Sequence, residues 1–165
     1  MKKLLFIMML AISITSCRKD PFPDLDGKFL VYTEPSENVD FSKYTSFYVV
    51  DSVRVSEYNR PPYYSQTEGA KKLINQVQTN MKNMGYTASS SEEADLWIAL
   101  DYNLKMSTIL NIKMTLPKEE SEEKEVKLWT AHISGYHSYD YNYNMDRLTE
   151  GIDQAFEQSQ YIKKK

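Results

Sequence analysis

Glycine is scarce in this 165-residue sequence, which contains only five, and no two of them are near neighbours. Phosphate-cradling loops and dinucleotide-binding fingerprints need two or three glycines within a few residues, so neither signature is present. The sequence also lacks the Gly-x-Ser-x-Gly elbow that presents the nucleophilic serine of many hydrolases. We therefore predict no catalytic residue and no cofactor from local motifs.

Residues that bind metals are also sparse. The two histidines, His132 and His137, are five residues apart, which places them on opposite faces of a regular strand and makes them a poor metal pair. The acidic run 118–125 (KEESEEKE) could offer carboxylates to calcium, but it lacks the ligand spacing and glycine of an EF-hand loop. We expect no metal site and interpret 118–125 as a solvated hairpin loop, with a calcium-binding loop as the alternative.

Positive charge is not concentrated anywhere except at the end of the chain. The sequence has 20 Lys and Arg against 23 Asp and Glu, and its formal charge is −3. The only basic run is Lys163–Lys165, which we interpret as a short tail. Proteins that bind nucleic acid present a basic patch or stripe, so we predict no nucleic-acid partner.

The one long apolar run lies at the start of the chain, from Leu4 to Ile14, and it follows Lys2 and Lys3. Two positive charges before a short apolar segment are typical of a secretory signal peptide. The run is too short to span a bilayer, which requires about 20 apolar residues. We therefore expect an exported chain whose residues 1–16 are removed.

The single cysteine, Cys17, ends this apolar segment. Ile14-Thr15-Ser16-Cys17 resembles the lipobox of bacterial lipoproteins, in which the cysteine sulfur receives a diacylglycerol and the new amino group is often acylated, for example with palmitate. The resemblance implies that lipidated Cys17 holds the protein to a membrane of the cell envelope, and we expect the outer membrane. The alternative is an ordinary signal peptide that leaves Cys17 as a free thiol.

Residues 17–27 are charged, contain two prolines, and are interpreted as an extended tether after the lipidated cysteine. Lys19-Asp20 is similar to part of the lysine–acid signal that sends some lipoproteins to the cell surface. A plain solvated tether is the alternative, so the sequence leaves open which face of the outer membrane the domain occupies.

Residues 28–162 are predicted to form a single α+β domain with the element order β-β-α-β-β-β-α. A helix is expected after a Ser65 cap, with Glu68 as its capping-box partner and Gly85 at its end. The last three strands are joined by short loops, which favours an antiparallel meander. We predict a mostly antiparallel sheet of about five strands with both helices on one face. The expected strands are 28–33, 46–55, 96–106, 108–116 and 126–135, and the second helix is 146–162.

Alternation of apolar and polar residues identifies candidate core positions. In the strand beginning at Leu96, every second residue is apolar, so Leu96 is expected in the main core and Trp97 on the opposite face, partly exposed or under a loop. Trp129 is expected to anchor the last strand in the core.

Tyrosine is common, with 13 residues, and three of them alternate just before the second helix: Tyr139, Tyr141 and Tyr143. If this segment is extended, the period of two places the three rings on one side. Two interpretations remain open: ordinary core beneath the second helix, or a binding surface for a sugar or a partner protein.

Several short stretches resemble bacterial envelope lipoproteins of the domain-of-unknown-function family 4136, of the kind found in Bacteroidota. They are Phe41-Ser42-Lys43-Tyr44, Met84-Gly85-Tyr86, Ala94-Asp95-Leu96-Trp97 and the segment from Leu128 to Gly135. The resemblance implies the α+β fold above after a lipobox. The family brings no known activity, so it implies no catalytic residue.

Two functions are consistent with the sequence. The first is a non-enzymatic, membrane-anchored domain that binds an envelope protein or a glycan. The alternative is a small hydrolase that acts on glycans through carboxylates, which would require a cleft with two facing acidic side chains.

Overall fold

The computed structural model describes residues 30–104, 109–117, 126–134 and 141–164. Cys17, the tether, the acidic run 118–125 and Tyr139 lie outside the described residues, as do the side chains of Tyr141 and Tyr143. The predictions made for these positions therefore remain predictions.

Seven strands form one mixed sheet with the order β1-β7-β6-β5-β2-β3, and the short β4 pairs with β2. The bounds are β1 Leu30–Pro35, β2 Ser46–Ser56, β3 Tyr63–Ser65, β4 Thr87–Ala88, β5 Leu96–Asn103, β6 Ile109–Thr115 and β7 Lys127–Ser134. The α+β class and the antiparallel β5-β6-β7 meander are confirmed. The two shortest strands, β3 and β4, were not expected, because two or three residues leave no periodic pattern.

One pairing at the centre of the sheet is parallel. Strand β2 runs parallel to β5, and helix α2 (Glu68–Asn83) lies between them in the chain. A parallel pair needs such a crossover, because a tight turn can join only antiparallel neighbours. The sheet therefore combines a β-α-β unit with an antiparallel meander that β1 extends by pairing with β7.

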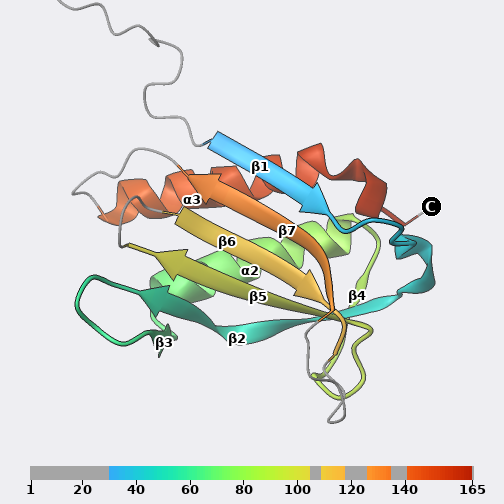
Figure 1. Cartoon of the computed structure of the whole chain (residues 1–165), viewed down its shortest axis with the longest axis horizontal. Helices are drawn as coiled ribbons and strands as arrows, with labels where there is room; N and C mark the ends of the chain where they lie inside the picture. Colours follow the sequence, from blue (N-terminus) through green and yellow to red (C-terminus); the bar gives the residue numbers. More distant parts are fainter. Residues whose placement is uncertain (1–29, 105–108, 118–125, 135–140, 165) are drawn as a thin grey trace, which may run out of the picture.

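Both long helices cover the same face of the sheet, as predicted, and Figure 1 shows them behind it. Helix α2 packs on β2, helix α3 (Tyr141–Gln158) packs on β1 and β7, and the two helices contact each other. Polar contacts also join them: Asp153 Oδ1 accepts hydrogen bonds from Gln76 Nε2 at 2.5 Å and from Asn80 Nδ2 at 2.6 Å. Two short 3₁₀ helices complete the described fold, η2 (Phe41–Lys43) and η3 (Gln160–Ile162).

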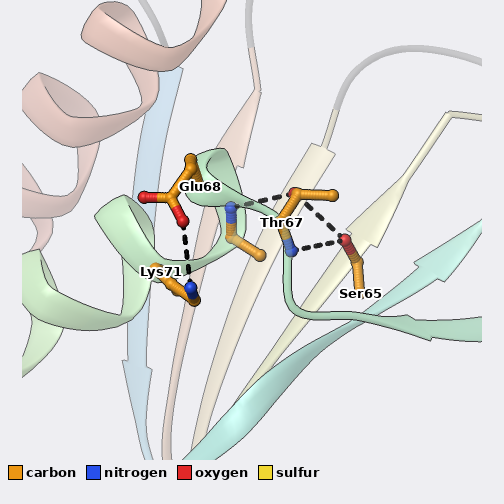
Figure 2. A network of polar contacts seen from close by, with 5 residues as sticks. Ser65, Thr67, Glu68 and Lys71 are labelled. Atoms are coloured by element: carbon orange, nitrogen blue, oxygen red, sulfur yellow. Dashed lines mark hydrogen bonds and ion pairs between the residues drawn. The ribbon is translucent and has the colours of Figure 1, made fainter.

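Helix α2 begins two residues later than the Ser65 cap predicted (Figure 2). Thr67 has extended backbone angles and is the N-cap, and its Oγ1 accepts a hydrogen bond from the Ala70 N–H at 3.4 Å. Ser65 instead ends β3, and its Oγ accepts from the Thr67 N–H at 3.5 Å. Glu68 opens the helix and forms an ion pair with Lys71 at 2.9 Å. The prediction for Ser65 is wrong because both hydroxyls suit a cap, and pairing with β2 keeps Ser65 in a strand.

The predicted end of this helix is confirmed. Met84 is the C-cap, and Gly85 follows with φ +95°, a conformation that side chains with a Cβ rarely adopt. A Cβ at Gly85 would also lie 3.1 Å from Lys164 Cβ, so the chain end packs closely against this turn.

The core lies between the sheet and the helices. Leu96 and Trp129 are fully buried, as predicted. Trp97 points to the other side, where it is half-buried, and its Nε1–H donates to the Ser91 carbonyl at 3.0 Å. The alternation in β5 therefore placed both residues correctly.

Candidate functional site

The face of the sheet opposite the helices (Figure 1) carries polar side chains that meet through strand pairing. Residues directly opposite each other on paired strands point to the same face. Following these pairs across the sheet gives one line of six outward residues, which we call the cross-sheet row. Its members, from β1 to β3, are Tyr32, His132, Asn111, Asp101, Arg54 and Tyr64.

Neighbouring strands lie about 4.8 Å apart, so the five steps of the row span about 24 Å. Each member comes from a different strand, and the strand pairing fixes their relative positions. The row is thus a long, shallow feature supported by regular backbone, and it does not depend on a loop for its shape.

An ion pair occupies the fourth and fifth positions of the row, next to Tyr64. Arg54 Nη1 donates to Asp101 Oδ2 at 2.5 Å, and the two side chains are 42% and 20% exposed. A pair with this much solvent contact contributes little to stability, about 0–1 kcal/mol. Its main effect is to fix the orientation of a guanidinium and a carboxylate that still reach the surface.

A second polar pair stands beside it. His132 Nδ1 lies 2.6 Å from Asn111 Oδ1. An amide oxygen can only accept, so Nδ1 is the donor in this contact and Nε2 is the ring nitrogen that it leaves over. The Tyr32 ring stacks on His132 with centroids 6.2 Å apart and planes inclined by 22°. The imidazole is thereby held from two sides.

Exposed tyrosine rings stand at both ends of the row. Tyr32 is 59% exposed and Tyr64 is 69% exposed. A tyrosine ring offers a flat apolar surface and a hydroxyl in the same side chain. The ends of the row are therefore the places where a flat partner could stack.

A half-buried aromatic pair lies elsewhere on the same face. Tyr48 and Trp97 face each other from β2 and β5, with centroids 5.6 Å apart and planes at 63°. Both rings are largely occupied with each other and with the segment at Ser91, so they brace this end of the face.

Asp95 ties the starts of β2 and β5 together. Its Oδ2 accepts from the backbone N–H groups of Thr45 at 2.7 Å and Ser46 at 2.9 Å, and from their hydroxyls at 2.9 Å and 3.0 Å. The Thr45 backbone hydrogen bond is the largest cause that lowers the pKa of Asp95 to about 2, and burial opposes the shift. Asp95 is therefore a structural carboxylate that sets the register of the parallel strands, and it is ionised at neutral pH.

Two of the three tyrosines in the predicted strip lie in helical backbone, because helix α3 begins at Tyr141, five residues earlier than expected. Side chains two residues apart share a side only in an extended segment, so this spacing does not group Tyr141 with Tyr143. Tyr139 and the side chains of the other two lie outside the described residues, so the binding strip stays a prediction. Sequence patterning missed the cross-sheet row because its members are scattered from 32 to 132 and meet only through strand register.

A shallow depression on the outer side of α2 offers little chemistry. Its lining includes one carboxylate, that of Glu68, which is already paired with Lys71. Among the residues that the structure describes, no group of three or more His, Cys, Asp and Glu side chains could hold a metal ion. Neither α2 nor α3 is long and apolar enough to cross a membrane.

Comparison with known proteins identifies a shared fold. No family model matches the sequence, and no curated protein matches it. Among solved structures, a DUF4136 family protein from Bacteroides thetaiotaomicron superposes with a TM-score of 0.73 at 22% identity, covering 84% of this chain and 99% of that one. The PelC dodecamer protein from Paraburkholderia phytofirmans gives a TM-score of 0.44 at 11% identity, over 83% of this chain and 99% of that one.

At 22% identity the first comparison establishes the fold and no activity. The agreement extends over nearly the whole of that protein. The chain therefore has the fold of a protein of domain-of-unknown-function family 4136, the family that its sequence resembles.

Proposed function

We propose that this chain is a membrane-anchored envelope lipoprotein whose domain binds a ligand on the open face of its sheet without catalysing a reaction. The observation that supports binding most directly is the cross-sheet row. Its polar groups are held in fixed orientations, and exposed rings stand at its two ends. Fixed groups lose little entropy when they bind, which favours recognition.

The same geometry supports binding over hydrolysis. A glycoside hydrolase needs two carboxyl groups about 5–10 Å apart on either side of the scissile bond. The row contains a single carboxylate, Asp101, and Arg54 engages it. Asp95 already accepts four hydrogen bonds on one oxygen and is committed to holding β2 and β5. No contact in the described part of the chain favours the hydrolase alternative.

The proposed anchor is Cys17, at the lipobox position. The chain between Cys17 and Leu30 can extend by at most about 45 Å, at roughly 3.5 Å per residue. Two or more acyl chains give stable attachment to a bilayer. A domain held in this way keeps its sheet face available to envelope components.

The anchor is tested by growing cells with radiolabelled palmitate. Cys17→Ser should abolish label incorporation and move the protein into the soluble envelope fraction, whereas Lys19→Ala, outside the lipobox, should keep both label and membrane association. Label that persists in Cys17→Ser would contradict the anchor.

The binding face is tested by lysine footprinting, which needs no knowledge of the ligand. Lys113 is exposed and stands on the open face, two residues from Asn111 along β6 and therefore about 7 Å from the row. Lys82 is exposed on α2. In intact envelopes Lys113 should be protected from an amine-reactive label relative to the purified protein, while Lys82 reacts equally in both. Equal labelling of Lys113 in the two samples would contradict a ligand on this face.

A further inference from the structure

We infer that the ligand of the open face is an uncharged polysaccharide strand that lies along the cross-sheet row from Tyr32 to Tyr64. This inference rests on the proposed function, because it names the ligand class for the same surface. Four properties of the row support it: the order of its side chains, its charge, its hydrogen-bonding groups and its shape.

The order of side chains favours a polar ligand over a protein partner. Protein interfaces concentrate apolar and aromatic residues at the centre and leave charged residues at the rim. The row has a different order, since polar and charged side chains fill its interior and the exposed rings of Tyr32 and Tyr64 stand at the ends. A protein covering this face would bury the Arg54–Asp101 ion pair within its interface, where desolvation is costly.

The charge of the face favours a neutral ligand. The charges of Arg54 and Asp101 cancel within the row. In the adjacent line of outward residues, Thr130 lies between Glu34 on β1 and Lys113 on β6, so this line also carries one charge of each sign. Binding a polyanion requires several basic groups that neutralise its charges together, whereas these two lines of residues carry no net positive charge.

The remaining hydrogen-bonding capacity of the row matches hydroxyl groups. Arg54 uses one of its five N–H donors on Asp101, and Asp101 keeps its second oxygen as an acceptor. His132 leaves Nε2 for a ligand because Nδ1 is directed to Asn111. A sugar hydroxyl donates and accepts at once, so donors and acceptors alternating along a line suit it.

The rings and the shape complete the match. A pyranose has faces of C–H groups that can pack on the flat ring of a tyrosine, while its hydroxyls project from the edge. The row crosses six strands and spans about 24 Å. Such a surface can accept the middle of a long chain, whereas a small ligand would need an enclosing pocket.

The test uses the full-length lipidated protein in detergent and three insoluble neutral polysaccharides: cellulose, curdlan and chitin. Heparin beads serve as the polyanionic comparison. The wild-type protein should sediment with at least one neutral polysaccharide, and raising the salt concentration from 50 mM to 500 mM should leave the binding unchanged, since no net charge is neutralised. Tyr32→Ala and Tyr64→Ala should each weaken binding by about tenfold, which corresponds to about 1.4 kcal/mol.

A matched control distinguishes binding at the row from non-specific adsorption through any exposed tyrosine. Tyr58 is 68% exposed, nearly the same as Tyr64 at 69%, but it lies in the connection between β2 and β3 and not in the row. Tyr58→Ala should bind like the wild type. Because all three rings are exposed, each variant should keep the wild-type melting temperature, which excludes unfolding as the cause of lost binding.

The remaining outcomes are decisive. Binding to none of the three neutral polysaccharides, or salt-sensitive binding to heparin alone, would overturn the neutral polysaccharide. If Lys113 were nevertheless protected in envelopes, the proposed binding function would stand with another ligand. An equal loss of binding in Tyr58→Ala and Tyr64→Ala would overturn the placement on the row. If Lys113 were unprotected and no polysaccharide bound, the proposed binding function would fail as well.

Discussion

The two faces of the sheet differ in the burial and the polarity of their side chains. Toward the helices, β5 presents Leu96, Ile98 and Leu100, each at most 2% exposed. Toward the open side, the same strand presents Trp97, Ala99 and Asp101, which remain accessible or half-buried. The first set removes apolar surface from water, whereas in the second set Asp101 pairs with Arg54 and Trp97 packs against Tyr48 near the surface. Stability should therefore respond to changes on the covered face, and binding to changes on the open face.

The largest expected effect is on the covered face. Leu96→Ala should lower the free energy of unfolding by about 2–5 kcal/mol, because it removes buried methyl groups and leaves a cavity. The neighbouring change Ala99→Ser, on the open face, should cost well under 1 kcal/mol. Urea or thermal unfolding of both variants measures the difference, and an unchanged melting temperature in Leu96→Ala would contradict the assigned register.

Asp95 joins the starts of β2 and β5, and its effect on stability should depend on pH. The hydrogen bonds of Thr45 and Ser46 lower the pKa of Asp95 from 3.8 to about 2. A carboxylate whose pKa falls on folding stabilises the folded state above the unfolded pKa, and this contribution is lost as pH drops from about 4 to 2. Because the carboxylate is partly exposed, we expect Asp95→Asn to cost about 1 kcal/mol at pH 7.

The matching measurement is the free energy of unfolding of the wild type and of Asp95→Asn at pH 7 and pH 2. The difference in the free energy of unfolding between the two proteins should be smaller at pH 2 than at pH 7. Glu93→Gln, in the same segment, is the control and should give no such narrowing. A gap of constant size across this range would show that the ionised form of Asp95 is not what holds the strands.

The smallest expected effect on stability is that of the ion pair in the row. Arg54→Ala should change the free energy of unfolding by less than about 1 kcal/mol, since both partners contact solvent. A double-mutant cycle with Asp101→Ala isolates their interaction. A coupling energy above about 3 kcal/mol would show that this pair stabilises the fold. It would contradict the statement that stability depends mainly on the covered face.

Sequence patterning located the covered face well. The alternation around Leu96 and the end of the first helix at Gly85 each depend on local sequence, and the structure confirms both. The N-cap of α2 was misassigned to Ser65 because Thr67, two residues later, has the same capping chemistry. Side-chain chemistry alone does not tell which of the two hydroxyl residues caps the helix. The pairing of β3 with β2 decides, because it keeps Ser65 in a strand.

The open face could not be predicted in the same way. Arg54 and Asp101 are 47 residues apart and meet because β2 and β5 run parallel around α2. His132 and Asn111 meet through the register of β6 and β7. Polar residues on strands look alike in a sequence whether or not they pair, so only the strand order and register reveal the row.

The central claim is that ligand binding depends on the exposed ends of the cross-sheet row. It is tested most directly by lysine footprinting of row variants in intact envelopes. We predict that the double variant Tyr32→Ala, Tyr64→Ala loses the protection of Lys113 that the wild type shows, whereas Tyr58→Ala keeps it and Lys82 reacts equally in all three proteins. Undiminished protection of Lys113 in the double variant would contradict the account.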